Sequence, residues 1–374
     1  MPKDPVPELL ARATEALEQE LGTLESFEPE AGEDSELRLQ VLRETARRLG
    51  DNYPYFHPLY AGQMLKPPHP VARAAYALAM KINPNNHALD GGRASSALEV
   101  EAVREIAAMS GWTEFLGHLT SSGTMANLEA LWIAGRIAEG TGSKRPGKER
   151  QRRIVGSEQA HYTHQRISGV LRLEYTPIAS DAAGRMNLEA LESELRKRDV
   201  GTVVATLGTT ATGAVDPLAE ILALAAQYGS RVHVDAAYGG YFGLIPEELG
   251  EPARRAFAAI GRADSIVIDP HKHGLQPYGC GCVLFRDPAM GRFYKHDSPY
   301  TYFTSKQLHL GEISLECSRA GAAAVALWAT QRLLPLVKGG EFARGLAKSR
   351  RAALELDRRL REDRRWARRI AGSV

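Results

Sequence analysis

Cysteine is scarce in this sequence, with only Cys280, Cys282 and Cys317 among 374 residues. Three unevenly spaced cysteines cannot build a disulfide framework. The pair Cys280 and Cys282 also lacks the two-residue spacer and the second cysteine pair that are usual in a zinc site. We therefore expect reduced thiols and no metal centre.

Long apolar runs and an excess of charge of one sign are missing too. The N-terminus, 1–4, has no apolar signal core, and no run reaches the length that spans a bilayer. The formal net charge of +2 gives no reason to expect a nucleic acid or a membrane surface as a partner. These absences predict a cytoplasmic protein.

The sequence does contain an alternation of short apolar runs and helical patterns. We expect strands at about 115–119, 153–156, 202–207, 231–235, 264–269 and 282–285. We expect a helix before the first strand at about 96–109, and helices between the strands at about 125–138, 162–170, 188–198, 216–228 and 252–261. This alternation predicts an α/β fold with a mostly parallel sheet between helices, in which ligands bind beyond the carboxyl ends of the strands.

Helical and irregular segments flank this alternation. Two charged amphipathic helices at about 8–21 and 35–49 precede a loop rich in proline and aromatic residues at 51–70. Near the other end, 293–310 has no clear period and is typical of a long functional loop, and the chain is helical from 318 onward. We divide the chain into an N-terminal arm with loops (1–95), a large α/β domain (96–315) and a helical C-terminal segment (316–374).

Lys272 and Asp235 both stand at the carboxyl ends of expected strands. Lys272 follows the apolar run 266–268 and lies between two histidines, an unusual place for a residue that seeks water. A buried lysine loses its charge and can form a Schiff base, and an aspartate is the partner that a protonated pyridine nitrogen needs. Together they indicate pyridoxal phosphate. Taken alone, Lys272 also suits a strand-end lysine that reaches solvent, and Asp235 a helix cap.

A third feature fits the same cofactor. The turn Ser122-Gly123-Thr124 joins an expected strand to an expected helix, so its backbone amides and hydroxyls lie at a helix N-terminus, an arrangement that holds phosphate. No lysine follows as in the nucleotide-binding loop, and without context the turn would be an ordinary helix start. A phosphate site upstream of an aspartate and a Schiff-base lysine completes the contacts for one cofactor.

Six segments carry a specific resemblance, and they occur in order between about residues 50 and 320. They are His57-Pro58-Leu59-Tyr60-Ala61-Gly62-Gln63, Ser122-Gly123-Thr124, Gln159-Ala160-His161, Thr206-Leu207-Gly208-Thr209-Thr210, His233-Val234-Asp235-Ala236-Ala237-Tyr238 and Asp269-Pro270-His271-Lys272. With them the chain resembles the group II pyridoxal-phosphate-dependent amino acid decarboxylases, the family of glutamate, aromatic-L-amino-acid and histidine decarboxylases. The resemblance implies fold-type I, aspartate aminotransferase-like architecture with a mostly parallel seven-stranded sheet and an N-terminal helical arm. Members usually continue with a small C-terminal domain, so we expect either an abbreviated C-terminal segment or a truncated sequence here.

The resemblance also implies roles for individual residues. Lys272 would bind the cofactor, and Asp235 would pair with its ring nitrogen. The other implied roles are phosphate binding by Ser122, Gly123, Thr124, His271 and Ser265, ring-face contacts by His161 and Ala237, and a contact near the ring oxygen by Thr210. A loop tyrosine that reaches the partner subunit would return a proton to Cα, and Tyr300 and Tyr302 are the candidates.

The implied activity is decarboxylation of an L-amino acid by a homodimer with shared active sites. Another fold-type I reaction, by a lyase or a transaminase, and a catalytically silent cofactor-binding homologue are the alternatives. The substrate stays open between two classes. Arg93 or Arg319 would favour an acidic side chain, and the aromatic residues at 53–60 a tyrosine-like one, while His57, Tyr60 and His87 lie in loops that could form the pocket.

Overall fold

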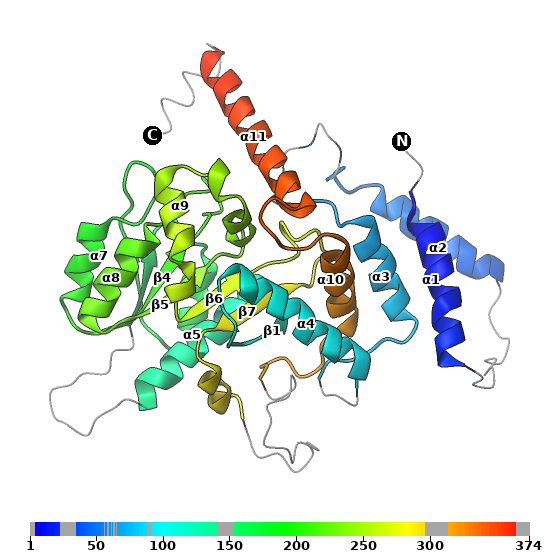
Figure 1. Cartoon of the computed structure of the whole chain (residues 1–374), viewed down its shortest axis with the longest axis horizontal. Coiled ribbons are helices and arrows are strands. Elements are labelled where there is room, and N and C mark those ends of the chain that lie inside the picture. The colour runs from blue at the N-terminus through cyan, green and yellow to red at the C-terminus, as the bar shows by residue number, and fades with distance from the viewer. Residues whose placement is uncertain are drawn as a thin grey trace.

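Helices and strands alternate along the chain and build one seven-stranded sheet with helices on both faces (Figure 1). The computed structural model describes residues 4–22, 35–55, 57, 60, 62, 64, 66–87, 91–140, 153–295 and 313–363. The helices are α1 (Val6–Leu21), α2 (Ser35–Leu49), α3 (Pro70–Met80), α4 (Arg93–Met109), α5 (Gly123–Gly140), α6 (Thr163–Val170), α7 (Leu188–Leu195), α8 (Leu218–Tyr228), α9 (Glu251–Ala258), α10 (Gly321–Leu333) and α11 (Glu341–Glu362). The strands are β1 (Leu116–Thr120), β2 (Arg153–Ser157), β3 (Tyr175–Ile178), β4 (Val200–Thr206), β5 (Arg231–Asp235), β6 (Ser265–Ile268) and β7 (Gly281–Phe285).

The sheet has the strand order β1-β7-β6-β5-β4-β2-β3. Only β7 runs antiparallel to its neighbours β6 and β1, so the other six strands point the same way. The predicted α/β class and the mostly parallel seven-stranded sheet are confirmed. The carboxyl ends of the parallel strands meet at one edge, where such sheets bind ligands.

Side chains on the strands alternate between two cores, one on each face of the sheet. In β6, Ile266 and Ile268 belong to the core that includes α4 and α8, whereas Val267 belongs to the core under α5. In β5, Val232 and Val234 likewise face the α4 and α8 side. Because side chains in a strand point alternately to opposite faces, His233 and Asp235 face the side covered by α5 and α6.

Two elements were not predicted from the sequence. Strand β3 contains Pro177, which removes a donor, and β3 tolerates it because it is the edge strand and pairs only with β2. Helix α3 begins directly after the proline-rich loop with Pro70 in its first turn, and His69 Nδ1 accepts a hydrogen bond from the Val71 amide (3.2 Å). The prolines that argued against a helix before residue 70 therefore mark its start.

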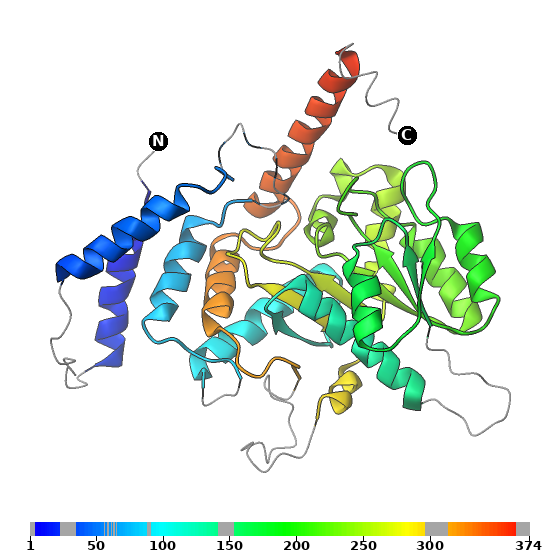
Figure 2. The ribbon, with the colours of Figure 1, turned by 180° about the vertical axis from the view of Figure 1, so that it is seen from behind.

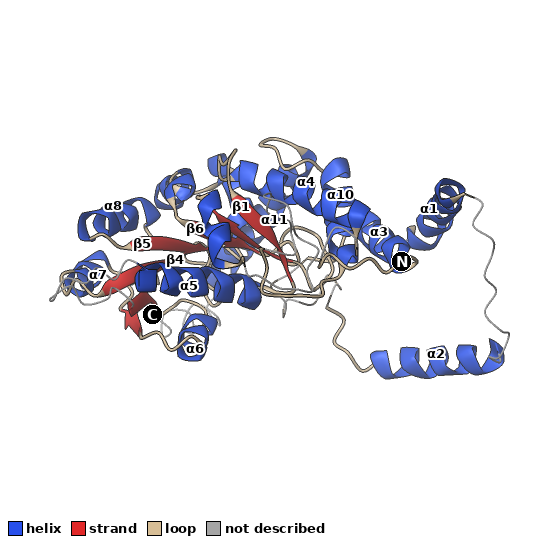
Figure 3. Ribbon diagram, turned by 90° about the horizontal axis from the view of Figure 1, so that it is seen from below, coloured by secondary structure: helices blue, strands red, loops and turns tan. Residues whose placement is uncertain are grey.

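Helices α1, α3 and α4 from the N-terminal part of the chain gather with α10 at one end of the sheet. Helix α1 packs against α3, and α3 and α4 both pack against α10, as the view from behind also shows (Figure 2). Helix α2 has no buried residue and stands apart from the body (Figure 3). Among the described residues, no helix is both long and apolar enough to cross a membrane.

Candidate active site

A pocket opens at the carboxyl edge of the sheet, where five parallel strands end. Its wall is formed by residues that follow β1, β2, β4, β5 and β6. The predicted site residues in this wall are Ser122, Gly123, Thr124, His161, Thr210, Asp235, Ala237, His271 and Lys272. The structure therefore brings together nine residues that are scattered over 151 positions of the sequence (122–272).

Lys272 follows β6 and reaches the pocket beside Asp269. Its Nζ lies 3.1 Å from Asp269 Oδ2, and 27% of its side chain is exposed. The side chain is therefore partly buried, and the pocket leaves its amine accessible. Burial raises the pKa of Asp269, and Lys272 and His271 oppose that rise. The accessible amine is the nucleophile that a carbonyl-bearing ligand would meet.

Asp235 ends β5 and is 5% exposed. Its Oδ2 lies 2.7 Å from His164 Nε2, and its Oδ1 accepts a hydrogen bond from the Ala237 amide (3.1 Å). Burial alone raises the pKa of Asp235, but the hydrogen bond and charge of His164, together with the charge of Lys272, bring it well below its usual range. Asp235 is therefore a carboxylate at neutral pH, which is the form that pairs with a protonated ring nitrogen.

The turn before α5 forms another part of the pocket wall, next to Asp269. Ser122 Oγ caps the helix by accepting a hydrogen bond from the Met125 amide (3.2 Å). The amides of Gly123 and Thr124 begin the helix, where no intrahelical acceptor exists for them. A Cβ at position 123 would overlap the Asp269 carboxyl group, so the close approach requires glycine. These amides can hold an anion.

Three further residues complete the wall. His271 is held by a hydrogen bond from Nδ1 to the Cys280 carbonyl (2.7 Å), which leaves Nε2 on the pocket side, 3.7 Å from Asp269 Oδ2. His161 Nδ1 accepts a hydrogen bond from the Thr163 amide (3.3 Å), and burial lowers the pKa of its ring. Ala237 is small and buried, so a flat ring can approach it closely.

Orphaned polar atoms in the wall support a polar ligand. Thr206 Oγ1 and Asp269 Oδ1 are buried and have no hydrogen-bond partner among the described residues. Buried polar atoms without a partner are costly, and a ligand that contacts them removes that cost. An anion site, a carboxylate and an amine around one pocket match the phosphate, ring nitrogen and carbonyl of pyridoxal phosphate. Among the described residues, no group of three or more His, Cys, Asp or Glu side chains could hold a metal ion.

Ser265 is the predicted cofactor residue that the structure does not bring to the pocket. It begins β6 at the amino end, the edge opposite to the pocket, and its Oγ lies 2.8 Å from His233 Nδ1. Ser265 is therefore too far along β6 from the pocket to contact a phosphate there, and its predicted role is withdrawn. The predicted proton donors Tyr300 and Tyr302 lie outside the described residues.

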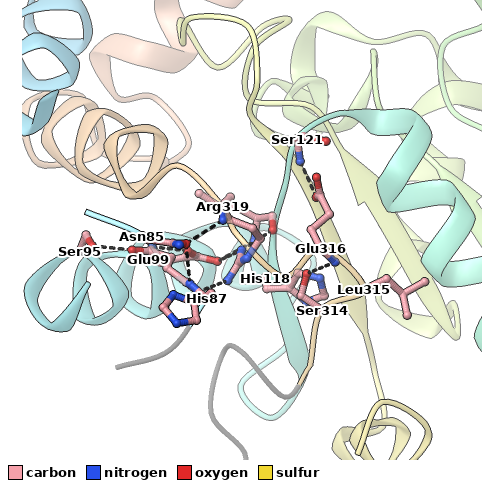
Figure 4. Close-up of polar contacts among 12 residues, drawn as sticks. Asn85, His87, Ser95, Glu99, His118, Ser121, Ser314, Leu315, Glu316 and Arg319 are labelled. Atoms are coloured by element: carbon pink, nitrogen blue, oxygen red, sulfur yellow. Dashed lines mark hydrogen bonds and ion pairs between the residues drawn. The ribbon is translucent and has the colours of Figure 1, made fainter. Parts of the chain in front are cut away.

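Arg319 was a candidate for binding an acidic substrate, but in the structure it pairs with Glu99 and the Leu119 carbonyl (Figure 4). Its Nη1 lies 2.7 Å from Glu99 Oε1 and 2.6 Å from the Leu119 carbonyl oxygen, and the side chain is 7% exposed. Nearby, Glu316 Oε2 accepts a hydrogen bond from the Ser121 amide (2.8 Å). Arg319 and Glu316 thus tie the segment before α10 to α4 and β1, and Arg319 is not free to bind a substrate.

The other proposed substrate residues lie apart from the pocket wall. Arg93 is exposed at the start of α4, and the described part of the wall includes neither it nor His87. His57 is exposed. Tyr60 packs with Tyr53 (ring centroids 6.0 Å apart) and Tyr55 (5.6 Å) in an aromatic cluster.

Sequence reasoning missed several residues of the site. Asp269 and Thr206 were inside the recognised segments but received no role, and Asn127 and Thr163 line the pocket from the helices. His164 was missed altogether. It stands three residues after His161 at the start of α6, and no sequence signal singled it out, since its contact with Asp235 depends on how α6 is rotated over β5.

Comparison with known proteins agrees with this site. A family model described as "Pyridoxal-dependent decarboxylase conserved domain" matches residues 25–367. An L-tyrosine decarboxylase of Enterococcus faecium is 30% identical over 387 aligned residues, covering 80% of this chain and 63% of that protein. A probable L-tyrosine/L-aspartate decarboxylase of Methanothrix thermoacetophila is 31% identical over 301 residues, covering 80% and 72%.

A solved structure agrees in fold. The crystal structure of mouse CSAD superposes with a TM-score of 0.77 at 23% identity and covers 96% of this chain and 73% of that one. This chain spans less than two thirds of the length of the Enterococcus faecium relative. The family match confirms the resemblance found in the sequence, and with it pyridoxal phosphate as the cofactor. The chain belongs to the pyridoxal-dependent decarboxylase family.

Proposed function

We propose that this chain decarboxylates an L-amino acid to the amine and carbon dioxide, with pyridoxal phosphate bound at Lys272. The observation that carries the proposal is that the Lys272 amine and the Asp235 carboxylate, from the neighbouring strands β6 and β5, line one pocket. These are the two contacts that separate a pyridoxal phosphate site from a general anion site. The names of the relatives, all decarboxylases, support the same activity.

Different residues of the pocket would bind different parts of the cofactor. The amides of Gly123 and Thr124 and the ring of His271 would hold the phosphate. Asp235 would hold the ring nitrogen, and Lys272 would bond to the carbonyl carbon. When bound, the cofactor supplies an electron sink for the electrons left by the departing carboxylate.

The protein groups set the conditions for that chemistry. Asp235 keeps a negative charge where the ring nitrogen must stay protonated, since both of its oxygens accept hydrogen bonds and these contacts outweigh the effect of its burial. His161 and Ala237 would cover the two faces of the ring and exclude water. Asp269 holds the Lys272 amine near the pocket by its ion pair. Thr210 would contact the ring oxygen side.

The substrate we propose is an aromatic or acidic L-amino acid. The two relatives described above are named for tyrosine and for tyrosine and aspartate. Since Glu99 occupies Arg319, the argument for an acidic side chain is weaker than it was from the sequence. The aromatic cluster of Tyr53, Tyr55 and Tyr60 lies apart from the described pocket wall, so the tyrosine-like class is supported by the names of these relatives.

The test is a screen of the purified protein with pyridoxal phosphate against all standard amino acids, scored for amine and carbon dioxide. We expect amine and carbon dioxide in equal amounts from one substrate class, and none from the Lys272→Ala variant. Keto acid without carbon dioxide would point to a transaminase, and an aldehyde product to another lyase. Cofactor absorbance without any product would point to a silent homologue, and each of these results would contradict the proposal.

We further propose that the chain acts as a homodimer. Helix α2 leaves five large apolar side chains exposed, at 42–64% of their surface, and monomeric proteins rarely expose such a stripe. They are Leu37, Leu39, Val41, Leu42 and Leu49. Light scattering after size-exclusion chromatography should give a molecular mass twice that of the chain. A double variant with Leu37→Asp and Leu42→Asp should give a lower mass. A wild-type monomer would contradict this proposal.

A cytoplasmic location completes the proposal. Cys280, Cys282 and Cys317 are all free thiols, and the last is exposed. Thiols persist in reducing compartments. Fractionation of the native host with an antibody to the chain would test the location, and recovery outside the cytoplasm would contradict it.

A further inference from the structure

A cluster of four buried polar side chains contains Asp235, and two of its members, Asp235 and Asn127, also line the pocket. The alternation of side chains in β5 points both His233 and Asp235 toward α5 and α6. Helix α6 presents His164 there, and α5 presents Asn127. All four side chains are at most 5% exposed, in a place where polar groups persist only when they are hydrogen-bonded.

His164 makes the shortest contact with Asp235. Its Nε2 lies 2.7 Å from Asp235 Oδ2, and the imidazole is fully buried. A histidine donates from Nε2 whether it is the Nε2-protonated neutral form or the imidazolium. Asp235 Oδ1 accepts from the Ala237 amide as well, so the described chain offers this carboxylate donors on both oxygens. A carboxylate surrounded by donors is favoured over the carboxylic acid, which would have to donate.

A second chain of hydrogen bonds, through His233, orients Asn127, the other side chain beside Asp235. Burial lowers the pKa of His233 to about 3, so its ring is neutral. His233 Nε2 donates to Asn127 Oδ1 (2.8 Å), and His233 Nδ1 accepts from Ser265 Oγ (2.8 Å). Asn127 must then turn its Nδ2 toward the Gly123 carbonyl (2.9 Å) and Asp235 Oδ2 (3.5 Å). The Gly123 carbonyl can only accept, so it fixes the orientation of the Asn127 amide next to Asp235, and Ser265 Oγ can satisfy the remaining nitrogen of His233.

We propose that His164 is a positioning residue that holds Asp235 as an oriented carboxylate for the ring nitrogen of pyridoxal phosphate. This inference rests on the proposed function for the role of Asp235, and it adds a residue that does not touch the cofactor. His164 lies outside the described pocket wall, whereas Asp235 is part of it. Its effect must therefore reach the cofactor through Asp235 and must depend on the ring nitrogen.

The test uses the full chain and two ligands that differ only at the ring nitrogen. Equilibrium affinity for pyridoxal phosphate and for 1-deazapyridoxal phosphate, which carries carbon in place of that nitrogen, is measured from the visible absorbance of the bound ligand. The variants are His164→Leu, which removes the donor, and His164→Gln, which can place an amide N–H at a similar reach. Thermal unfolding of each variant without ligand shows whether it is folded.

We expect His164→Leu to weaken binding of pyridoxal phosphate by about tenfold, as loss of a hydrogen bond to a charged group does. Binding of the deaza analogue should stay close to that of the wild type, and His164→Gln should regain most of the lost affinity. Equal losses with both ligands, or no loss with either, would overturn the inference. If the two variants bind as expected but the wild-type protein releases no amine from any amino acid, only the proposed function is contradicted.

Discussion

Arg319 and Glu99 form a buried ion pair between the segment before α10 and helix α4, with Nη1 2.7 Å from Oε1. The two side chains are 7% and 2% exposed. Glu99 also accepts hydrogen bonds from the Leu119 amide (3.0 Å) and from Asn86 Nδ2 (2.6 Å). The pair therefore connects α4, β1 and the start of the C-terminal helices, and its role is structural.

Removing Arg319 should destabilise the protein strongly. Arg319→Met leaves Glu99 as an uncompensated buried charge, which costs about 3–5 kcal/mol in the free energy of unfolding. Urea unfolding measures this loss. Arg332→Met is the matched control, since Arg332 pairs with Glu101 and Glu105 at the surface and should contribute about 1 kcal/mol or less. Unchanged stability of Arg319→Met, with a raised KM for an acidic substrate, would show instead that Arg319 binds substrate.

The Gly123→Ala substitution should block the cofactor. The new Cβ would lie 2.7 Å from Asp269 Oδ1 and 2.8 Å from Cγ, so the turn and the Asp269–Lys272 pair could not keep their positions. We expect at least a tenfold loss of affinity for pyridoxal phosphate, since a shift of this size costs over about 1.4 kcal/mol. Absorbance titration measures it. Gly140→Ala, at the other end of the same helix, meets nothing within 4 Å and should bind as the wild type does. Equal affinities for both variants would contradict this reading of the turn.

The sequence predicted the strands of the sheet well because their apolar runs record burial on both faces. Parallel topology alone placed Asp235 and Lys272 at the carboxyl edge, whereas the resemblance to a known family supplied His161, Thr210, Ala237 and His271. Ser265 was misplaced for a reason visible in the same pattern. It stands at the amino end of its expected strand, so a contact at the carboxyl edge was inconsistent with the predicted topology.

Other parts of the site depended on information that the sequence does not carry. The burial of Arg319 follows from the packing of α4 beside the segment before α10, two regions more than 200 positions apart. The contact between His164 and Asp235 requires the rotation of α6 about its axis over β5, which the helical spacing alone does not give. Charge and spacing in the sequence indicate candidate site residues, whereas the partner of each candidate depends on tertiary packing.

Lys272 should be the lysine that carries the cofactor. Lys272→Ala should abolish the covalent linkage that borohydride reduces, and should leave no measurable amine product, because no other amine replaces its Nζ in the pocket wall that the structure describes. Mass spectrometry after reduction measures the linkage. Lys66→Met is the matched control, since the Lys66 amide donates to the Lys272 carbonyl (3.3 Å) and its side chain lines an adjacent pocket. The assignment would be refuted by a reduced adduct that persists in Lys272→Ala.

His273 should make the fold sensitive to acid. Its ring is 7% exposed, packs edge-on against Tyr238 and Phe242, and has no hydrogen-bond partner at either nitrogen in the described part of the chain. Burial lowers its pKa to about 4, and the charges of Lys66 and Lys272 act in the same direction. The unfolded chain, with a histidine pKa of about 6.5, binds a proton that the folded chain does not, so stability is present above pH 6.5 and is lost as the pH falls toward 4. The His273→Phe variant keeps an aromatic ring in place and cannot titrate.

Between pH 7 and pH 5 the variant should lose about 2 kcal/mol less of its free energy of unfolding than the wild type does, measured by urea unfolding at both pH values. Equal losses in the two proteins would show that His273 is not the group that titrates.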